Sequence, residues 1–120
     1  MAELFYVTML GFFITHELDA MQRHEWRVLP LTSFLPEETG RRVFLWMHVP
    51  LFAVLFFLGA GDPSTRLAQG LSAFAIVHVG LHWLFRNHPK NEFNNPVSWA
   101  LIIGAGLGGV GHLAATQLSV

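Results

Sequence analysis

The sequence predicts an all-α integral membrane protein, a bundle of four transmembrane helices that forms a single domain over residues 1–120. Hydrophobic residues make up 52% of the chain and charged residues only 12%, about half the charge of a typical soluble domain. The charges are also absent from long stretches, each of them long enough to cross a bilayer. The 11 phenylalanines and 4 tryptophans exclude a disordered chain.

Four apolar segments account for most of the chain, and the predicted helices cover about 3–22, 42–60, 66–86 and 96–118. Residues 43–61 and 67–85 contain no charge over 19 residues each, and no charged residue follows Glu92. Roughly 20 residues of helix cross a hydrocarbon core of about 30 Å. The first segment is long enough if its charged end, with Glu17 and Asp19, reaches the interface.

Basic residues in the connections predict the orientation. Six of the seven Lys and Arg residues flank the first and third connections: Arg23, Arg27, Arg41, Arg42, Arg86 and Lys90. Only Arg66 lies near the second connection. Because basic residues concentrate on the cytoplasmic side, we expect the first and third connections in the cytoplasm and both termini outside it.

Six of the seven histidines map near the predicted cytoplasmic ends of the helices. At 1.5 Å per residue, His16, His48, His78 and His82 each lie roughly 6–12 Å from the arginines that mark this boundary. His78 and His82 are one turn apart on one helix face. Ionisable side chains inside a membrane usually face the bundle interior, so we expect these imidazoles to face one another.

Imidazoles and carboxylates without sulfur are ligands for Zn, Fe or Mn. The chain has no cysteine, so thiolate ligands and disulfides are excluded. We expect His16, Asp19, His78 and His82 to hold a divalent metal. Glu17 and His48 are the candidate proton acceptors. Four further residues are expected around the metal or on a lid, namely His24, Arg86, His88 and Glu92.

Several functions remain open at this point. The metal site would suit a metal-dependent membrane hydrolase or oxidoreductase acting near the cytoplasmic face. The alternatives are a metal or proton carrier, and a haem protein with His16 and His82 as axial ligands. The histidines could also simply hydrogen-bond between helices. A net charge of -1 argues against nucleic-acid binding, so the expected partner is the lipid bilayer.

Glycine is concentrated in the fourth segment, where Gly104 and Gly108 form a GxxxG pattern. Such a face lets a second helix approach closely, either in the same chain or in a second copy, so a homo-oligomer is a possible assembly. His112 lies at the opposite end from the other histidines and is expected to be a capping or interfacial residue. Asn95 followed by Pro96 is typical of a helix start.

The run HELDAMQRHEWR at 16–27, Trp46 with His48, and His78 with His82 followed by FRNHPKNEFNN together resemble a group of small four-helix bacterial membrane proteins of uncharacterised function. More distantly, the chain is similar to the HXXEE family, in which a histidine and an acidic pair lie on the first helix. Here His16 and Asp19 match that motif, with one acidic residue where two are expected. The resemblance implies a four-helix fold in a bacterial inner membrane and a catalytic or metal-binding role, and it names no substrate.

Overall fold

The computed structural model describes residues 1–118, which form four α-helices, one short 3-10 helix and no strand. The elements are α1 (Ala2–Gln22), η1 (Glu25–Arg27), α2 (Glu37–Ala60), α3 (Arg66–Leu84) and α4 (Pro96–Leu118). The all-α class predicted from the sequence is confirmed.

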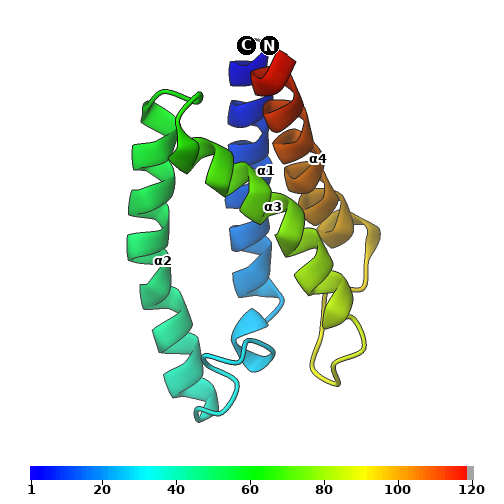
Figure 1. The fold of residues 1–120 in the computed structure, drawn as a ribbon. Coiled ribbons are helices and arrows are strands. Elements are labelled where there is room, and N and C mark those ends of the chain that lie inside the picture. The colour runs from blue at the N-terminus through cyan, green and yellow to red at the C-terminus, as the bar shows by residue number, and fades with distance from the viewer. Residues whose placement is uncertain (119–120) are drawn as a thin grey trace.

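The helices run alternately up and down an elongated molecule of 49 × 27 × 19 Å. The start of α1, the end of α4 and the turn between α2 and α3 lie at one end, and the other two connections lie at the opposite end (Figure 1). We call these the turn end and the loop end. α1 packs along α4, α3 crosses both obliquely, and α2 stands apart with few contacts to α1 or α3.

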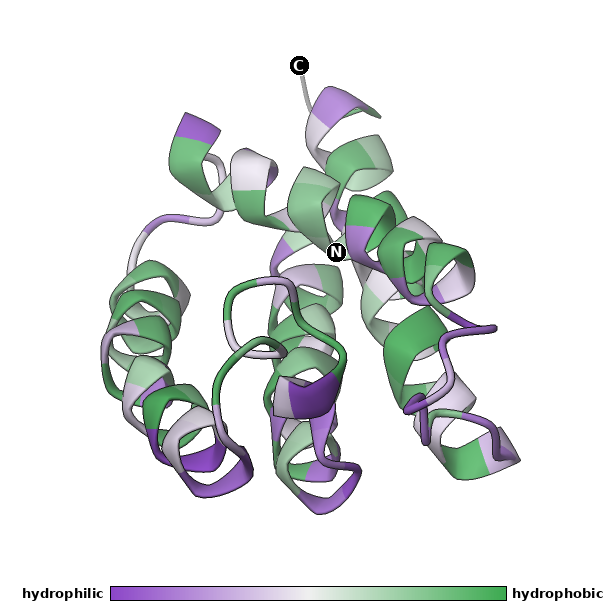
Figure 2. Cartoon of the chain, turned by 90° about the horizontal axis from the view of Figure 1, so that it is seen from below, coloured by the Kyte–Doolittle hydropathy of each residue, from purple (hydrophilic) through white to green (hydrophobic). Residues whose placement is uncertain are grey.

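Three of the helices, α2, α3 and α4, are long and apolar enough to cross a membrane. α1 does not belong to this set, because its last two turns carry His16, Glu17 and Asp19. Figure 2 shows that hydrophobic residues dominate the helices and that hydrophilic residues gather in the connections at the loop end. Three of the four predicted spans are therefore long and apolar enough to cross a membrane, and the fourth stays a prediction.

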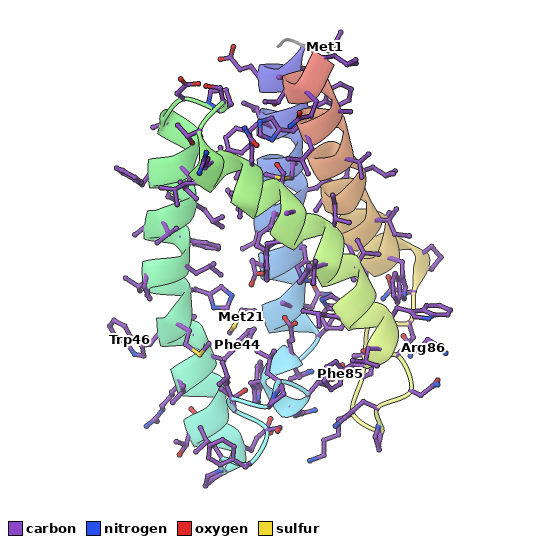
Figure 3. All side chains as sticks on the ribbon, in the orientation of Figure 1. Met1, Met21, Phe44, Trp46, Phe85 and Arg86 are labelled. Atoms are coloured by element: carbon purple, nitrogen blue, oxygen red, sulfur yellow. The ribbon has the colours of Figure 1, made fainter. Side chains whose placement is uncertain are left out.

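The outer face of α2 carries large apolar side chains that no other helix covers. Trp46 is 71% exposed and Phe57 is 74% exposed, whereas Phe44 on the opposite face is 3% exposed. Figure 3 shows Trp46 directed away from the bundle and Phe44 directed toward α1. Exposure of so many apolar side chains is expected where a helix faces lipid rather than water.

The helix boundaries follow local capping chemistry. α2 begins at Glu37, earlier than the expected residue 42, because Pro36 suits the start of a helix and acidic residues are favourable in a first turn. Thr65 caps α3 by accepting a hydrogen bond from the Ala68 N–H at 3.2 Å. Asn95 accepts one from the Ser98 N–H at 2.9 Å, as its place before α4 predicts.

The glycine face of α4 packs on α1 of the same chain. A Cβ atom added at Gly108 would lie 2.8 Å from the Met9 Cβ and 2.9 Å from its Cα, and Gly104 faces the ring of Phe12. Only glycine permits so close an approach of the two backbones. Of the two packing partners that the sequence left open, this structure contains the intrachain one, and a homo-oligomer stays a prediction.

Candidate metal centre

The end of α1 is shaped so that the chain turns back toward α3. α1 ends at Gln22, and His24 adopts a left-handed backbone conformation with φ of 56°. This conformation interrupts the helix and starts the 3-10 turn at Glu25. As a result, the Glu25 carboxylate lies beside His82 of α3, with 3.7 Å between Oε1 and Nε2.

Three imidazoles and one carboxylate converge at this level of the bundle. One donor atom from each of His16, Glu25, His78 and His82 lies within 4.8 Å of all the others. The Nε2 atoms of His78 and His82 are 3.2 Å apart. Ligands on a tetrahedral ion with bonds of about 2.1 Å lie about 3.4 Å apart, so small movements of these side chains suffice to bind one ion.

The buried position of His16 is not explained by hydrogen bonds within the described residues. Its side chain is 0% exposed, and neither ring nitrogen has a hydrogen-bond partner among residues 1–118. Its ring packs against those of Phe93, His78 and His82, at centroid distances of 5.6, 4.7 and 4.8 Å. A buried polar group without a partner costs about 1–3 kcal/mol, and coordination of a metal would remove that cost.

Glu25 is the carboxylate of the cluster, and its environment opposes a negative charge. Burial, and next the nearby charge of Glu17, raise the pKa of Glu25 to about 8. A bound cation reverses this balance because it favours the ionised carboxylate. Binding of a cation at the cluster would therefore stabilise Glu25 in its charged form.

Glu17 and His48 form a second buried pair next to the cluster. His48 Nδ1–H donates to the Phe44 carbonyl at 2.7 Å, and His48 Nε2 lies 2.9 Å from Glu17 Oε2. Because the Phe44 carbonyl can only accept, Nδ1 carries a proton, and a further proton must lie between Nε2 and the carboxylate. The pair thus combines a proton donor and acceptor in a buried place, as acid–base chemistry requires.

A cavity of about 450 Å³ connects the pair and the cluster. It lies between α2 on one side and α1 and α3 on the other, at the loop end of the bundle. Glu17, His48, Glu25, His78 and His82 all contribute to its wall, and most of the other lining residues are apolar. Its volume is far larger than a single ion requires.

The structure does not bring Asp19 into the cluster. Its Oδ2 accepts a hydrogen bond from the Ser98 hydroxyl at 2.6 Å, and its Oδ1 lies 3.4 Å from Arg23. Asp19 therefore ties α1 to the start of α4, and the ligand role expected for it stays a prediction. The other three expected ligands, His16, His78 and His82, do lie together.

The four residues expected around the metal or on a lid lie at the loop end. His24 Nδ1 pairs with Glu92 Oε2 at 2.7 Å, so these two join the first and third connections. Arg86 stacks over the Trp83 ring at 3.8 Å and donates to the Trp83 carbonyl. The His88 ring accepts a hydrogen bond from the Lys90 N–H within its own turn. None of the four belongs to the cluster in the described part of the chain.

Glu25 is the cluster member that sequence reasoning missed. Counting residues around a helix assumes that α1 continues to residue 25. The helix in fact ends before His24, so the position of Glu25 does not follow from that count. The available signal was the second His-Glu pair, His24-Glu25, directly after the first pair, His16-Glu17. Local sequence does not show that the helix ends between them and that a 3-10 turn follows.

Comparison with known proteins identifies a family for this chain and no individual relative. No curated protein and no solved structure matches the chain. The more distant similarity to the HXXEE family stays a prediction. A family profile described as a family of unknown function, DUF6713, matches residues 2–119. The match covers nearly the whole chain, and the chain therefore belongs to the DUF6713 family.

Proposed function

We propose that this protein is a membrane-embedded metalloenzyme whose divalent ion is held by His16, Glu25, His78 and His82. One observation carries the proposal: His16 is completely buried, has no hydrogen-bond partner within residues 1–118, and lies where three further ligand atoms converge. A histidine that served only to join helices would be expected to hydrogen-bond to one of them.

The donor set favours Zn, Fe or Mn. Three imidazoles and one carboxylate are common ligands for these ions, and the chain has no cysteine to favour a softer one. Zn would be bound by these four ligands and would take the water or substrate as a fifth ligand. Fe and Mn would add oxygen ligands from water or substrate.

The surroundings of the cluster favour an enzyme over a carrier. A bound divalent ion would polarise a substrate bond or lower the pKa of a coordinated water to near 7. The Glu17–His48 pair faces the same cavity and would take the proton of the attacking water. In a hydrolysis, the water oxygen forms the new bond, the leaving group departs, and the pair returns the proton to it. A carrier of metal ions alone would not require the proton-transfer pair, and a carrier of protons alone would not require the metal ligands.

We further propose that α1 is a fourth membrane span, with both termini outside the cytoplasm of a bacterium and the metal centre near the cytoplasmic face of the inner membrane. α1 has 21 residues and runs beside α4, so its length of about 31 Å is sufficient. Its ionisable residues His16 and Glu17 are buried against other helices rather than exposed to lipid.

Metal analysis of the purified protein tests the metal centre. We expect about one Zn, Fe or Mn per chain by inductively coupled plasma mass spectrometry, or one Zn after reconstitution and removal of excess metal. His16→Leu should lose the ion, whereas His88→Leu, a control at a histidine outside the cluster, should keep it. A visible spectrum recorded on the same samples tests the haem alternative.

Absence of bound metal in a well-folded wild-type sample, before and after reconstitution, would refute the proposal. Equal metal content in His16→Leu and wild type would refute this ligand set. A Soret band would instead assign the histidines to haem.

Cysteine labelling tests the four-span arrangement. The natural chain has no cysteine, so each introduced one reports a single position. In intact cells, an impermeant maleimide should label Glu3→Cys and Ser64→Cys but not Lys90→Cys. Labelling of Lys90→Cys together with protection of Glu3→Cys would contradict the proposed orientation.

A further inference from the structure

The cavity beside the metal centre has the size of one hydrocarbon chain. Its volume of about 450 Å³ corresponds to about 15 groups the size of a water molecule, at about 30 Å³ each. Along α3 its lining runs from Phe74 to Phe85, a length of about 16 Å. A cavity of this volume and length accommodates a single extended acyl chain.

The polar groups are confined to one half of the cavity. Its innermost wall, nearest the middle of the helices, consists of Phe13, Leu51 and Phe74. One turn closer to the loop end, the wall carries Glu17, His48 and His78, and His82, Glu25 and Asn91 follow beyond them. The polar groups therefore lie only in the loop-end half, among apolar residues such as Phe44 and Leu81, and the inner half is wholly apolar.

The α3 side of the cavity carries apolar, partly exposed side chains. Phe74 and Leu81 line the cavity and are 46% and 41% exposed. α2 has few contacts with α3, so the helices do not close this side. Phe44 of α2 and Phe85, just past the end of α3, both line the cavity, and Figure 3 labels them. An opening lined by apolar side chains between two membrane helices favours entry of an apolar ligand from the lipid phase.

From these features we infer that the substrate of the metal centre is a single-chain amphiphile that enters from the bilayer. Its acyl chain would lie against Phe13, Leu51 and Phe74. Its carboxylate or ester group would lie at the wall formed by the histidines and glutamates, next to the proposed metal ligands and the Glu17–His48 pair. This inference rests on the proposed metal centre for the chemistry, but binding of the chain requires only the cavity.

Photo-crosslinking with a diazirine derivative of palmitic acid tests the inference on the full-length protein in phosphatidylcholine nanodiscs. We expect saturable labelling of cavity residues, mapped by mass spectrometry, and competition by unlabelled palmitate. Leu51→Trp fills the inner part of the cavity and should reduce this labelling about tenfold, the loss expected from about two unburied methylene groups. Leu45→Trp is the matched control, because Leu45 lies on α2 outside the cavity lining and is 46% exposed.

Phe74→Trp provides a second blocking variant from α3, so the result does not depend on the folding of Leu51→Trp alone. Labelling that does not saturate, that is confined to outward residues such as Phe57, or that is equal in all variants would overturn the inference and indicate ordinary boundary lipid. If acetate, a water-soluble carboxylate, reduced the labelling at a concentration similar to that of palmitate, the ligand would not need an acyl chain and the inference would be overturned.

The same experiment on His16→Leu separates the two proposals. We expect cavity labelling to persist in this variant although the metal is lost. Labelling without metal in the wild type would refute the metal centre and keep the chain-binding cavity. Metal binding without saturable labelling would keep the metal centre and refute the amphiphile.

Discussion

Two buried histidines at opposite ends of the bundle have opposite surroundings. At the turn end, His112 is 0% exposed, its Nε2–H donates to the Pro63 carbonyl at 2.7 Å, and its Nδ1 accepts from the Ser72 hydroxyl at 2.7 Å. At the loop end, His16 is equally buried, yet neither of its ring nitrogens has a partner in the described residues. Burial alone therefore does not distinguish a structural histidine from a candidate ligand.

The difference lies in what each imidazole faces. His112 joins α4 to α3 and to the turn between α2 and α3, and it also stacks on Tyr6 at 4.7 Å. His16 faces two other imidazoles and, with them, a carboxylate whose pKa is raised by burial. A fully hydrogen-bonded histidine stabilises the fold without a ligand, whereas the burial of an imidazole without partners, such as His16, is unfavourable until a cation binds.

The largest expected effect is loss of the metal in His16→Leu. Removing one of four ligands should weaken Zn binding by about a thousandfold or more, because the remaining ligands no longer enclose the ion. The metal-free variant should be as stable as the metal-free wild type or up to about 2 kcal/mol more stable, since an unpaired buried polar group has been replaced by an apolar one. Chelator competition and denaturation by SDS followed by circular dichroism measure these two quantities. A metal-free His16→Leu that unfolds much more easily would show that His16 is structural.

His112→Ala should have the reverse outcome. We expect the free energy of unfolding to fall by about 3 kcal/mol, because the change removes two hydrogen bonds, leaves the Pro63 carbonyl without this donor and the Ser72 hydroxyl with only the Met9 sulfur at 3.3 Å, and creates a cavity. The folded variant should still bind one metal ion. The same SDS titration and metal analysis apply. Loss of metal from folded His112→Ala would mean that the two ends of the bundle are not independent.

Close packing of α4 on α1 near His112 supplies the next test. Gly108→Ala should destabilise the protein by about 2 kcal/mol, because the new Cβ would lie 2.8 Å from Met9 Cβ and the two helices would have to separate. Gly80→Ala is the matched control, since no atom lies within 4 Å of its added Cβ, and it should be neutral or slightly stabilising. Equal effects of the two substitutions would contradict the packing described for α4.

The smallest expected effect is the pH dependence contributed by Glu25. Its pKa is raised to about 8 without metal, so below that pH the carboxyl is mostly protonated and must lose its proton to bind an ion. Zn affinity should therefore fall as pH falls from 8 to 6.5, by up to about tenfold per pH unit from this group. Glu25→Gln should bind more weakly and show a slope smaller by about one proton. Chelator competition at several pH values measures both, and identical slopes would exclude Glu25 as a ligand.

The sequence predicts the membrane helices well because their physical signal is local. Long charge-free stretches identify α2, α3 and α4, and a proline after Asn95 marks the start of α4. The common depth of His16, His78 and His82 follows from counting residues along each helix. These inferences need only the helical rise and the positions of the charged residues.

The parts that sequence reasoning could not supply depend on the chain leaving a helix or on contacts between helices. The left-handed conformation of His24 brings Glu25 to the cluster, and nothing in the local sequence requires the helix to end there. The hydroxyl of Ser98, from α4, gives Asp19 a hydrogen bond at a distance in sequence of 79 residues. These two features decide which carboxylate joins the histidines. Both depend on the tertiary structure and not on the local sequence.

X-ray absorption spectroscopy at the Zn edge, on protein reconstituted with one equivalent of Zn, tests the proposed metal centre. We expect a first shell of nitrogen and oxygen atoms at about 2.0–2.1 Å, with the multiple scattering of three imidazoles. A shell of oxygen atoms without imidazole scattering, or with that of a single imidazole, would contradict a metal centre built on His16, His78 and His82.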